Sequence, residues 1–190
     1  FLDNGYTVAV PNYNTMPRPH KRPYNCGKDR NLGDMRLVKD VYDATAALAR
    51  AGVDPNRIFT VGQSLGAQIG ADAISPNNAR LANKYNWGPV PRAVVGLYGG
   101  CRYPRKTYLD GDIVRPVLWI AGEKDTFSYT EYGCASWTIS SFMKNQPDSK
   151  FIVYKDATHC FDCKQLDGFV NKREKQTYRY NETATNQSRD

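Results

Sequence analysis

A serine between two glycines is the feature of this sequence that most directly suggests chemistry. The segment Gly62-Gln63-Ser64-Leu65-Gly66 follows an apolar run and precedes small residues suited to a helix. A nucleophile at the tip of a tight strand-to-helix turn has strained backbone angles, so side chains two residues away on either side are expected to clash. The turn also places Ser64 at a helix N-terminus, where the backbone N–H of Leu65 can help to hold an oxyanion. The pattern predicts a nucleophilic serine, with Gly62, Gln63 and Gly66 completing its turn.

A serine nucleophile needs a base to accept its proton, and the chain has only two histidines. His20 lies before Ser64 in a proline-rich segment, whereas His159 comes after the last apolar run that could form a strand. The chain order expected for this kind of turn is nucleophile, then acid, then histidine. His159 fits that order and His20 does not, so we predict that His159 is the general base.

The acid that orients the histidine is expected between the two, on a loop that directly follows a strand. Asp125 and Glu123 both follow the apolar run at residues 117–121. A carboxylate here would accept the Nδ1–H bond of His159, hold its tautomer and stabilise the imidazolium. We favour Asp125 because it lies deeper in the loop after a glycine turn, and Glu123 remains the alternative.

Short apolar runs alternate with helical patterns along the chain, which is typical of a parallel sheet. The predicted strands are at residues 6–10, 57–61, 93–98, 117–121 and 151–154. The predicted helices run from Asp34, an expected N-cap, to Gly52, from about 64 to 74, and from 129 to about 143. The sequence therefore predicts an α/β fold with a doubly wound, mainly parallel sheet. Ligands of such sheets bind beyond the carboxyl ends of the strands, where the loops after residues 61, 121 and 154 begin.

Charge and cysteine usage exclude several function classes. The net charge of +7 would suit a nucleic-acid partner, but the basic residues are scattered and form no recognition helix or stacking platform. No apolar run approaches the ~20 residues that a membrane helix requires. The five cysteines form one closely spaced pair, Cys160 and Cys163, which leaves too few ligands for a structural zinc site. We expect no nucleic-acid partner, no membrane span and no metal.

Motifs along nearly the whole chain resemble the dienelactone hydrolase family of α/β-hydrolases. Residues 116–125 (PVLWIAGEKD) are similar to the family's acid segment, which favours Asp125 over Glu123. Residues 157–162 (ATHCFD) are similar to its histidine segment, and further similar segments are 4–11, 46–48, 97–100 and 180–184. The resemblance implies an α/β-hydrolase that cleaves a carboxylic ester or lactone through an acyl-enzyme, without a cofactor.

The chain departs from the family pattern in three places. The founding members use a cysteine nucleophile where this chain has Ser64, so the resemblance does not extend to the dienelactone substrate. Cys160 replaces the glycine that usually follows the histidine, and a Cys160–Cys163 or longer disulfide is a hypothesis for bracing that loop. The family's first three strands, with the second oxyanion donor, and its final helix have no counterpart in residues 1–190. We expect a single hydrolase domain that is an internal fragment of a longer protein.

Two alternatives to an esterase stay open at this point. A serine peptidase or thioesterase would use the same three residues, because they set acyl transfer and not the leaving group. A binding module that kept the fold without turnover belongs to a different class. The favoured prediction is a serine hydrolase that acts on a small-molecule ester or lactone.

Overall fold

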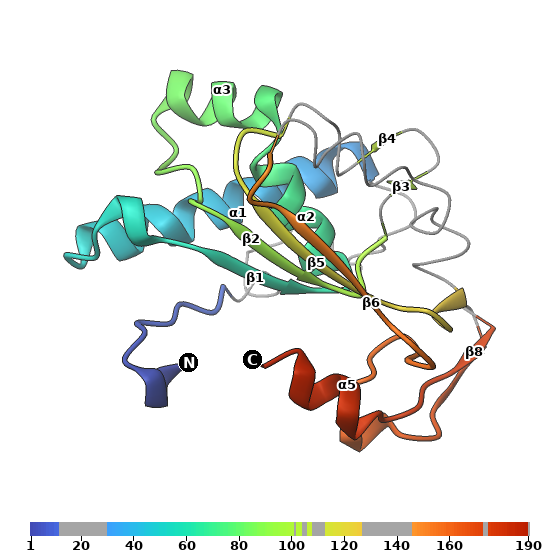
Figure 1. Cartoon of the computed structure of the whole chain (residues 1–190). Helices are drawn as coiled ribbons and strands as arrows, with labels where there is room; N and C mark the ends of the chain where they lie inside the picture. The colour runs from blue at the N-terminus through green and yellow to red at the C-terminus, as the bar shows by residue number, and fades with distance from the viewer. Residues whose placement is uncertain are drawn as a thin grey trace, which may run out of the picture.

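A four-stranded parallel sheet forms the centre of the computed structural model (Figure 1). The structure describes residues 1–11, 30–100, 102–103, 106–107, 113–126, 146–172 and 175–189. The strands lie in the order β1-β2-β5-β6 and are β1 (Thr60–Gln63), β2 (Val94–Leu97), β5 (Val117–Gly122) and β6 (Lys150–Tyr154). Every neighbouring pair is parallel, so the four carboxyl ends lie at one edge of the sheet. The parallel α/β class predicted from the sequence is confirmed in this arrangement.

The helix that directly follows β1 packs on the sheet, and other helices pack against that helix. The helices of the described residues are α1 (Arg30–Arg50), α2 (Leu65–Ala73), α3 (Pro76–Tyr85) and α5 (Glu182–Gln187). α2 packs against β1 and β2, and α1 packs against α2. Gly52 ends α1 as predicted, with a φ of 91° and an N–H that donates to the carbonyl of Ala49 at 3.1 Å. Within the described ranges, no helix is long and apolar enough to cross a membrane.

Short strands and turns lie outside the four-stranded sheet. They are the hairpin strands β3 (Arg102–Tyr103), β4 (Lys106–Thr107), β7 (Val170–Asn171) and β8 (Gln176–Thr177), with the short 3₁₀ turns η1 (Leu2–Asn4), η2 (Pro55–Arg57) and η4 (Lys164–Leu166). β7 and β8 pair antiparallel in the chain segment that follows the predicted histidine loop.

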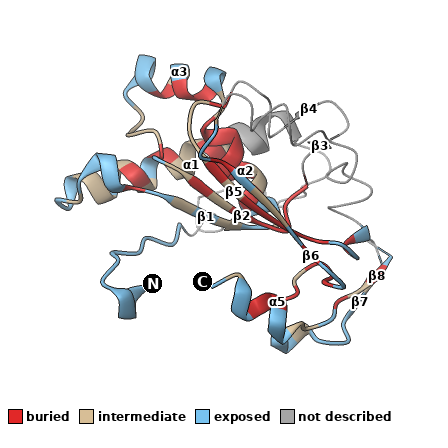
Figure 2. Cartoon of the chain, in the orientation of Figure 1, coloured by how far each residue is buried: buried red, intermediate tan, exposed pale blue. Residues whose placement is uncertain are grey.

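The core has two clusters of buried side chains. One is formed by α1, α2 and α3, around residues such as Val38, Tyr42 and Ile69. The other joins strand ends to the last part of the chain and includes Tyr98 and Phe161, both essentially inaccessible to solvent. Burial is greatest in the middle of the sheet, whereas β1 alternates between half-buried and exposed positions (Figure 2). Among the described residues, β1 is thus one of the two outer strands and forms an open edge of the sheet, and β5 is the most buried strand.

Residues 6–10, predicted as a strand, are not one. The segment pairs with no strand among the described residues, and the side chains of Val8 and Val10 are 44% and 85% exposed. An extended segment without a partner forms no ladder of hydrogen bonds and buries little apolar surface. The strand-like residue types of this segment are thus insufficient by themselves to make it a strand.

Several predicted boundaries are also wrong. α1 begins four residues before Asp34, so this residue lies inside the helix and is not its N-cap. β1 begins at Thr60 rather than at residue 57, because η2 occupies the positions before it and the Asp54 side chain caps that turn. The predicted helix at residues 129 to about 143 lies outside the described residues.

The pair Ser75-Pro76, predicted as a helix stop, also starts a helix. Ser75 accepts a hydrogen bond from the N–H of Asn78 at 3.4 Å, and proline suits the first helical position because it has no N–H to satisfy. α3 was therefore missed. The short helix α5 begins within the family-like segment 180–184, and Asn181 caps it by accepting from the N–H of Ala184 at 2.9 Å.

Removing the Tyr42 hydroxyl tests how α1 is tied to α2. This buried hydroxyl donates a hydrogen bond to the carbonyl of Ala73, so Tyr42→Phe should lower the free energy of unfolding by about 1–2 kcal/mol. Tyr85→Phe is the matched control, because Tyr85 is 56% exposed and a surface change of this kind costs less than about 0.5 kcal/mol. Urea unfolding of both variants measures the difference. Equal losses would contradict the assignment of this bond.

Candidate active site

Ser64 is the single residue between the end of β1 and the start of α2. Its φ of 49° and ψ of −116° are rare for a residue with a side chain. Its N–H donates to the carbonyl of Leu97 in β2 at 2.9 Å, and its carbonyl accepts from the N–H of Ala67 at 3.1 Å. These two bonds fix the strained backbone from both sides, and the side chain projects from a turn that cannot relax easily.

The two glycines of the turn differ in their reason for being glycine. A Cβ on Gly62 would lie 2.3 Å from the backbone carbon and oxygen of Gly66, so the turn closes only without a side chain there. A Cβ on Gly66 would meet no atom within 4 Å. The expectation that both positions would clash is therefore correct for Gly62 and wrong for Gly66.

His159 lies on the loop after β6 and is almost completely buried, with 3% of its surface exposed. Its Nδ1 is 2.7 Å from Oδ2 of Asp125, and its Nε2 is 3.0 Å from Oγ of Ser64. The imidazole is held between the rings of Tyr98 and Tyr178, with centroid distances of 5.0 and 5.5 Å. The structure therefore brings together the three residues that the sequence singled out.

Asp125 is fully buried and follows β5, where its N–H donates to the carbonyl of Gly122 at 3.1 Å. Gly122 permits the contact between this loop and the histidine loop, since a Cβ there would lie 2.4 Å from the carbonyl oxygen of Ala157. Glu123 is exposed and instead accepts a hydrogen bond from the N–H of Asp156 at 3.2 Å. Of the two carboxylates left open by the sequence, Asp125 is the one that contacts the histidine.

This arrangement suits the transfer of a proton from the hydroxyl of Ser64. With Nδ1 facing a buried carboxylate, the neutral imidazole keeps its proton on Nδ1, and Nε2 can accept the hydrogen bond of the Ser64 hydroxyl. Leu65 is the first residue of α2, so its N–H belongs to the first-turn donors without a partner inside the helix. Negative charge that develops beside Ser64 is favoured at such a helix N-terminus.

A disulfide joins Cys160 and Cys163, directly after the histidine, with a Cα–Cα distance of 5.3 Å. This confirms the shorter of the pairings considered from the sequence. A carboxylate oxygen of Asp162 lies within 4.8 Å of both sulfur atoms, which groups three metal-ligating residue types. Sulfurs bonded to each other are not thiolates, and only thiolates bind metal ions strongly. The cluster in this oxidised form is therefore a loop brace.

Two residues near the site, Tyr98 and Asp162, were missed by sequence analysis. The Tyr98 hydroxyl donates to Oδ1 of Asp162 at 2.9 Å, and Nε2 of Gln63 donates to Oδ2 of the same carboxylate at 3.0 Å. Tyr98 directly follows β2, so the rule that singled out the loops after the other strands could have found it. Nothing local distinguishes Asp162, because its partners are far from it in the sequence.

Strained backbone is concentrated on these loops. Ser64, Tyr98, Asp156 and Cys160 all have φ values between 41° and 59° without being glycine. Such conformations cost about 1–3 kcal/mol each and persist only where the surroundings impose them. Their shared location at the carboxyl edge of the sheet marks this edge as the specialised part of the molecule.

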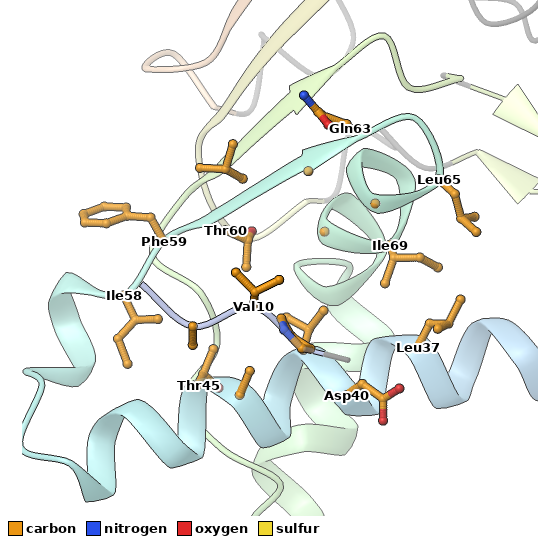
Figure 3. A pocket seen from close by; sticks show the side chains of 18 of the residues that line it. Val10, Leu37, Asp40, Thr45, Ile58, Phe59, Thr60, Gln63, Leu65 and Ile69 are labelled. Carbon is orange, nitrogen blue, oxygen red and sulfur yellow. The ribbon is translucent and has the colours of Figure 1, made fainter. Parts of the chain in front are cut away.

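A cavity of about 580 Å³ lies beside the open edge of the sheet, between residues 9–11, α1, β1 and α2 (Figure 3). Figure 3 shows Leu37 on α1 and Ile69 on α2 pointing into it. Burial is the main cause that raises the pKa of Asp40, which also lines the cavity, and nearby Arg36 partly opposes this. The lining includes Ser64 and its neighbours in the turn but neither Asp125 nor His159, so the cavity meets the candidate site at the turn around Ser64.

The sheet, the connections and the site at its carboxyl edge define an α/β-hydrolase. A model of the dienelactone hydrolase family matches residues 1–189, and the chain belongs to that family. A comparison with curated protein sequences gave no match.

Solved structures with a similar fold agree with this class. One is a dienelactone hydrolase-like promiscuous phosphotriesterase from metagenomic libraries, with a TM-score of 0.53, 22% identity, and coverage of 85% of this chain and 61% of that chain. Another is a carboxylesterase from Lactobacillus plantarum, with a TM-score of 0.53, 13% identity and coverage of 80% and 62%. A third is an α/β-hydrolase from a deep-sea metagenome, with a TM-score of 0.54, 14% identity and coverage of 80% and 60%. The chain thus spans less than two thirds of the length of each.

Adding one methyl group at each glycine of the turn tests the one-sided contact. Gly62→Ala should destabilise the fold by about 1–3 kcal/mol, because its methyl must displace the backbone of Gly66. Gly66→Ala is the matched control and should be neutral or slightly stabilising, since the space is open and alanine favours a helix by up to about 1 kcal/mol. Thermal unfolding of both variants measures the effect. An equal loss in the two would contradict the described packing.

Reducing the Cys160–Cys163 bridge tests how much it stabilises the fold. A bridge that closes so short a loop should contribute about 2 kcal/mol to the free energy of unfolding. Dithiothreitol should lower the stability of the parent protein to that of the Cys160→Ser/Cys163→Ser variant and leave the variant unchanged. A parent protein whose stability did not fall, while thiol titration showed reduction, would contradict this role.

Proposed function

We propose that this chain is a serine hydrolase that cleaves a carboxylic ester or lactone through an acyl-enzyme intermediate. The observation that carries the proposal is the hydrogen-bonded series from the buried carboxylate of Asp125 through His159 to the hydroxyl of Ser64. Two distances of 2.7 and 3.0 Å are within the range needed for proton transfer between a nucleophile and its base.

The first half of the proposed reaction forms the acyl-enzyme. Oγ of Ser64 attacks the carbonyl carbon of the ester while Nε2 of His159 takes the hydroxyl proton. Asp125 stabilises the imidazolium, and the N–H of Leu65 is positioned to hold the oxyanion of the tetrahedral intermediate. When the intermediate collapses, the C–O bond to the leaving group breaks and His159 gives its proton to the departing alkoxide.

The second half releases the acid. His159 takes a proton from water, and the hydroxide so formed attacks the carbonyl of the acyl-serine. Collapse of this second intermediate breaks the bond to Oγ, and His159 returns the proton to Ser64. The whole cycle uses water and the named residues. It therefore needs no cofactor, in line with what the family resemblance implies.

The choice of an ester or lactone as substrate rests on the chain's family. Two of the similar structures are described as a carboxylesterase and as a dienelactone hydrolase-like phosphotriesterase. The same residues would support attack on a thioester or a peptide, because the leaving group is not part of the site geometry. The family therefore decides the choice, and a small-molecule ester or lactone is the proposed substrate class.

A fluorophosphonate probe tests the nucleophile directly. The probe should label Ser64 in the parent protein, and Ser64→Ala should lose both the label and the hydrolysis of p-nitrophenyl acetate, by at least about 10³-fold in kcat. Retained turnover in Ser64→Ala would contradict the proposal, and so would failure of the parent protein to react with either compound.

Replacing each acid in turn tests the partner of the histidine. Asp125→Asn should lower kcat by on the order of 10⁴-fold, because an amide favours the wrong tautomer of His159. Glu123→Gln is the matched control and should keep its activity, since Glu123 is exposed and faces the N–H of Asp156. Activity that depended on Glu123 would overturn the assignment. Comparison of aryl ester, thioester and anilide substrates then assigns the bond that is cleaved.

A further inference from the structure

We propose that Asp162 is a positioning residue that locks the histidine loop onto the turn that carries the nucleophile. The proposal rests on the proposed function, because it concerns how Ser64 and His159 are kept within reach of each other. Asp162 itself is not placed against the reacting atoms. Its carboxylate instead accepts one hydrogen bond from each of two other loops of the same sheet edge.

The sheet order creates the need for such a lock. Ser64 follows β1 and His159 follows β6, and these are the two outer strands of the sheet. With β2 and β5 between them, the outer strands are roughly 14 Å apart, since neighbouring strands are separated by about 4.8 Å. Backbone pairing does not connect them directly. The 3.0 Å contact between Nε2 and Oγ must therefore be maintained by the loops above the sheet.

Asp162 supplies a direct connection between these loops. It lies three residues after His159, and its Oδ2 accepts from Nε2 of Gln63 at 3.0 Å. Gln63 is the last residue of β1 and precedes Ser64 in the chain. This single bond thus joins the residue next to the nucleophile to the loop that carries the base, across the full width of the sheet.

The second oxygen of Asp162 reaches the imidazole through Tyr98. Oδ1 accepts from the Tyr98 hydroxyl at 2.9 Å, and the Tyr98 ring lies edge-on to His159 at a centroid distance of 5.0 Å. Burial is the largest cause that raises the pKa of Tyr98, and the charge of Asp162 raises it further. Tyr98 therefore stays protonated at neutral pH and acts as the donor. Fixing its hydroxyl also fixes the ring that supports His159.

The direction of the Asp162 carboxylate is itself well determined. The disulfide closes the backbone on both sides of it, between Cys160 and Cys163. The neighbouring Phe161 is fully buried, packs edge-on against Tyr98 at 5.5 Å, and its carbonyl accepts from the N–H of Asn181 at 2.8 Å. A loop held at three points cannot turn the carboxylate away without breaking several contacts at once.

Substitution of Asp162 tests this role when kcat and KM are measured separately with p-nitrophenyl acetate. Asp162→Asn keeps the size of the side chain but loses the charge and one acceptor. It should lower kcat by roughly 10- to 100-fold and leave KM within about twofold, because a displaced base slows chemistry and not binding. The rate of fluorophosphonate labelling at Ser64 should fall in parallel. Asp156→Asn is the matched control, with an exposed carboxylate three residues before His159 that pairs with Lys124.

Coupling between the contacts distinguishes a lock from a general loss of stability. Gln63→Leu and Tyr98→Phe each remove one donor, and both remain informative if Asp162→Asn does not fold. Gln63→Leu should have less effect in the Asp162→Asn background than in the parent, because the two substitutions break the same bond. Melting temperatures of all variants show whether kcat falls while the fold is retained.

Two outcomes would overturn the proposal while leaving the proposed function intact. One is an Asp162→Asn variant with kcat and labelling rate equal to those of Asp156→Asn. The other is full additivity of Gln63→Leu and Asp162→Asn in kcat. Failure of the proposed function has a different signature, since it appears as turnover retained by Ser64→Ala in an otherwise unchanged protein.

Discussion

Ser64 and His159 follow the two outermost described strands of one parallel sheet, and the rest of the candidate site depends on closing the distance between them. Strand pairing sets β1 and β6 three strand spacings apart. The loops after β1, β2, β5 and β6 must therefore rise above the edge and converge, and side chains must hold them there. Asp125 does so from β5, Tyr98 from β2, and the carboxylate of Asp162 from the loop after β6.

Convergence requires backbone conformations that residues with side chains normally avoid. Positive φ values at Ser64, Tyr98 and Cys160 bring three of these loops to the points where their side chains meet. The strain is offset by specific bonds, such as the N–H of Tyr98 on the carbonyl of Ile120 at 2.7 Å and the disulfide after His159. Because this cost is met during folding, the imidazole of His159 and the hydroxyl of Ser64 are held within hydrogen-bond distance of each other.

Burial strengthens the interaction between Asp125 and His159. Asp125 and His159 are 0% and 3% exposed, so their interaction is only weakly screened by water. Ser64 is half-buried at the rim, beside the cavity along the open edge of β1. The carboxylate of Asp125 is thus shielded from solvent, whereas the hydroxyl of Ser64 lies at the more accessible rim. This order suits the proposed function, in which the Ser64 hydroxyl attacks a substrate carbonyl while His159 stays oriented.

Local signals in the sequence were sufficient for the parallel α/β class, for the bounds of β2, β5 and β6 to within one residue, and for Ser64, His159 and a choice between two carboxylates. Each of these follows from a period, a tight turn or a residue directly after a strand. Only the tertiary structure decided that Asp125 rather than Glu123 faces the histidine, that residues 6–10 pair with no described strand, and that Asp162 joins Gln63 to Tyr98. Those outcomes depend on distances across neighbouring strands and loops. Such distances are set by packing between segments far apart in the chain, which no local pattern contains.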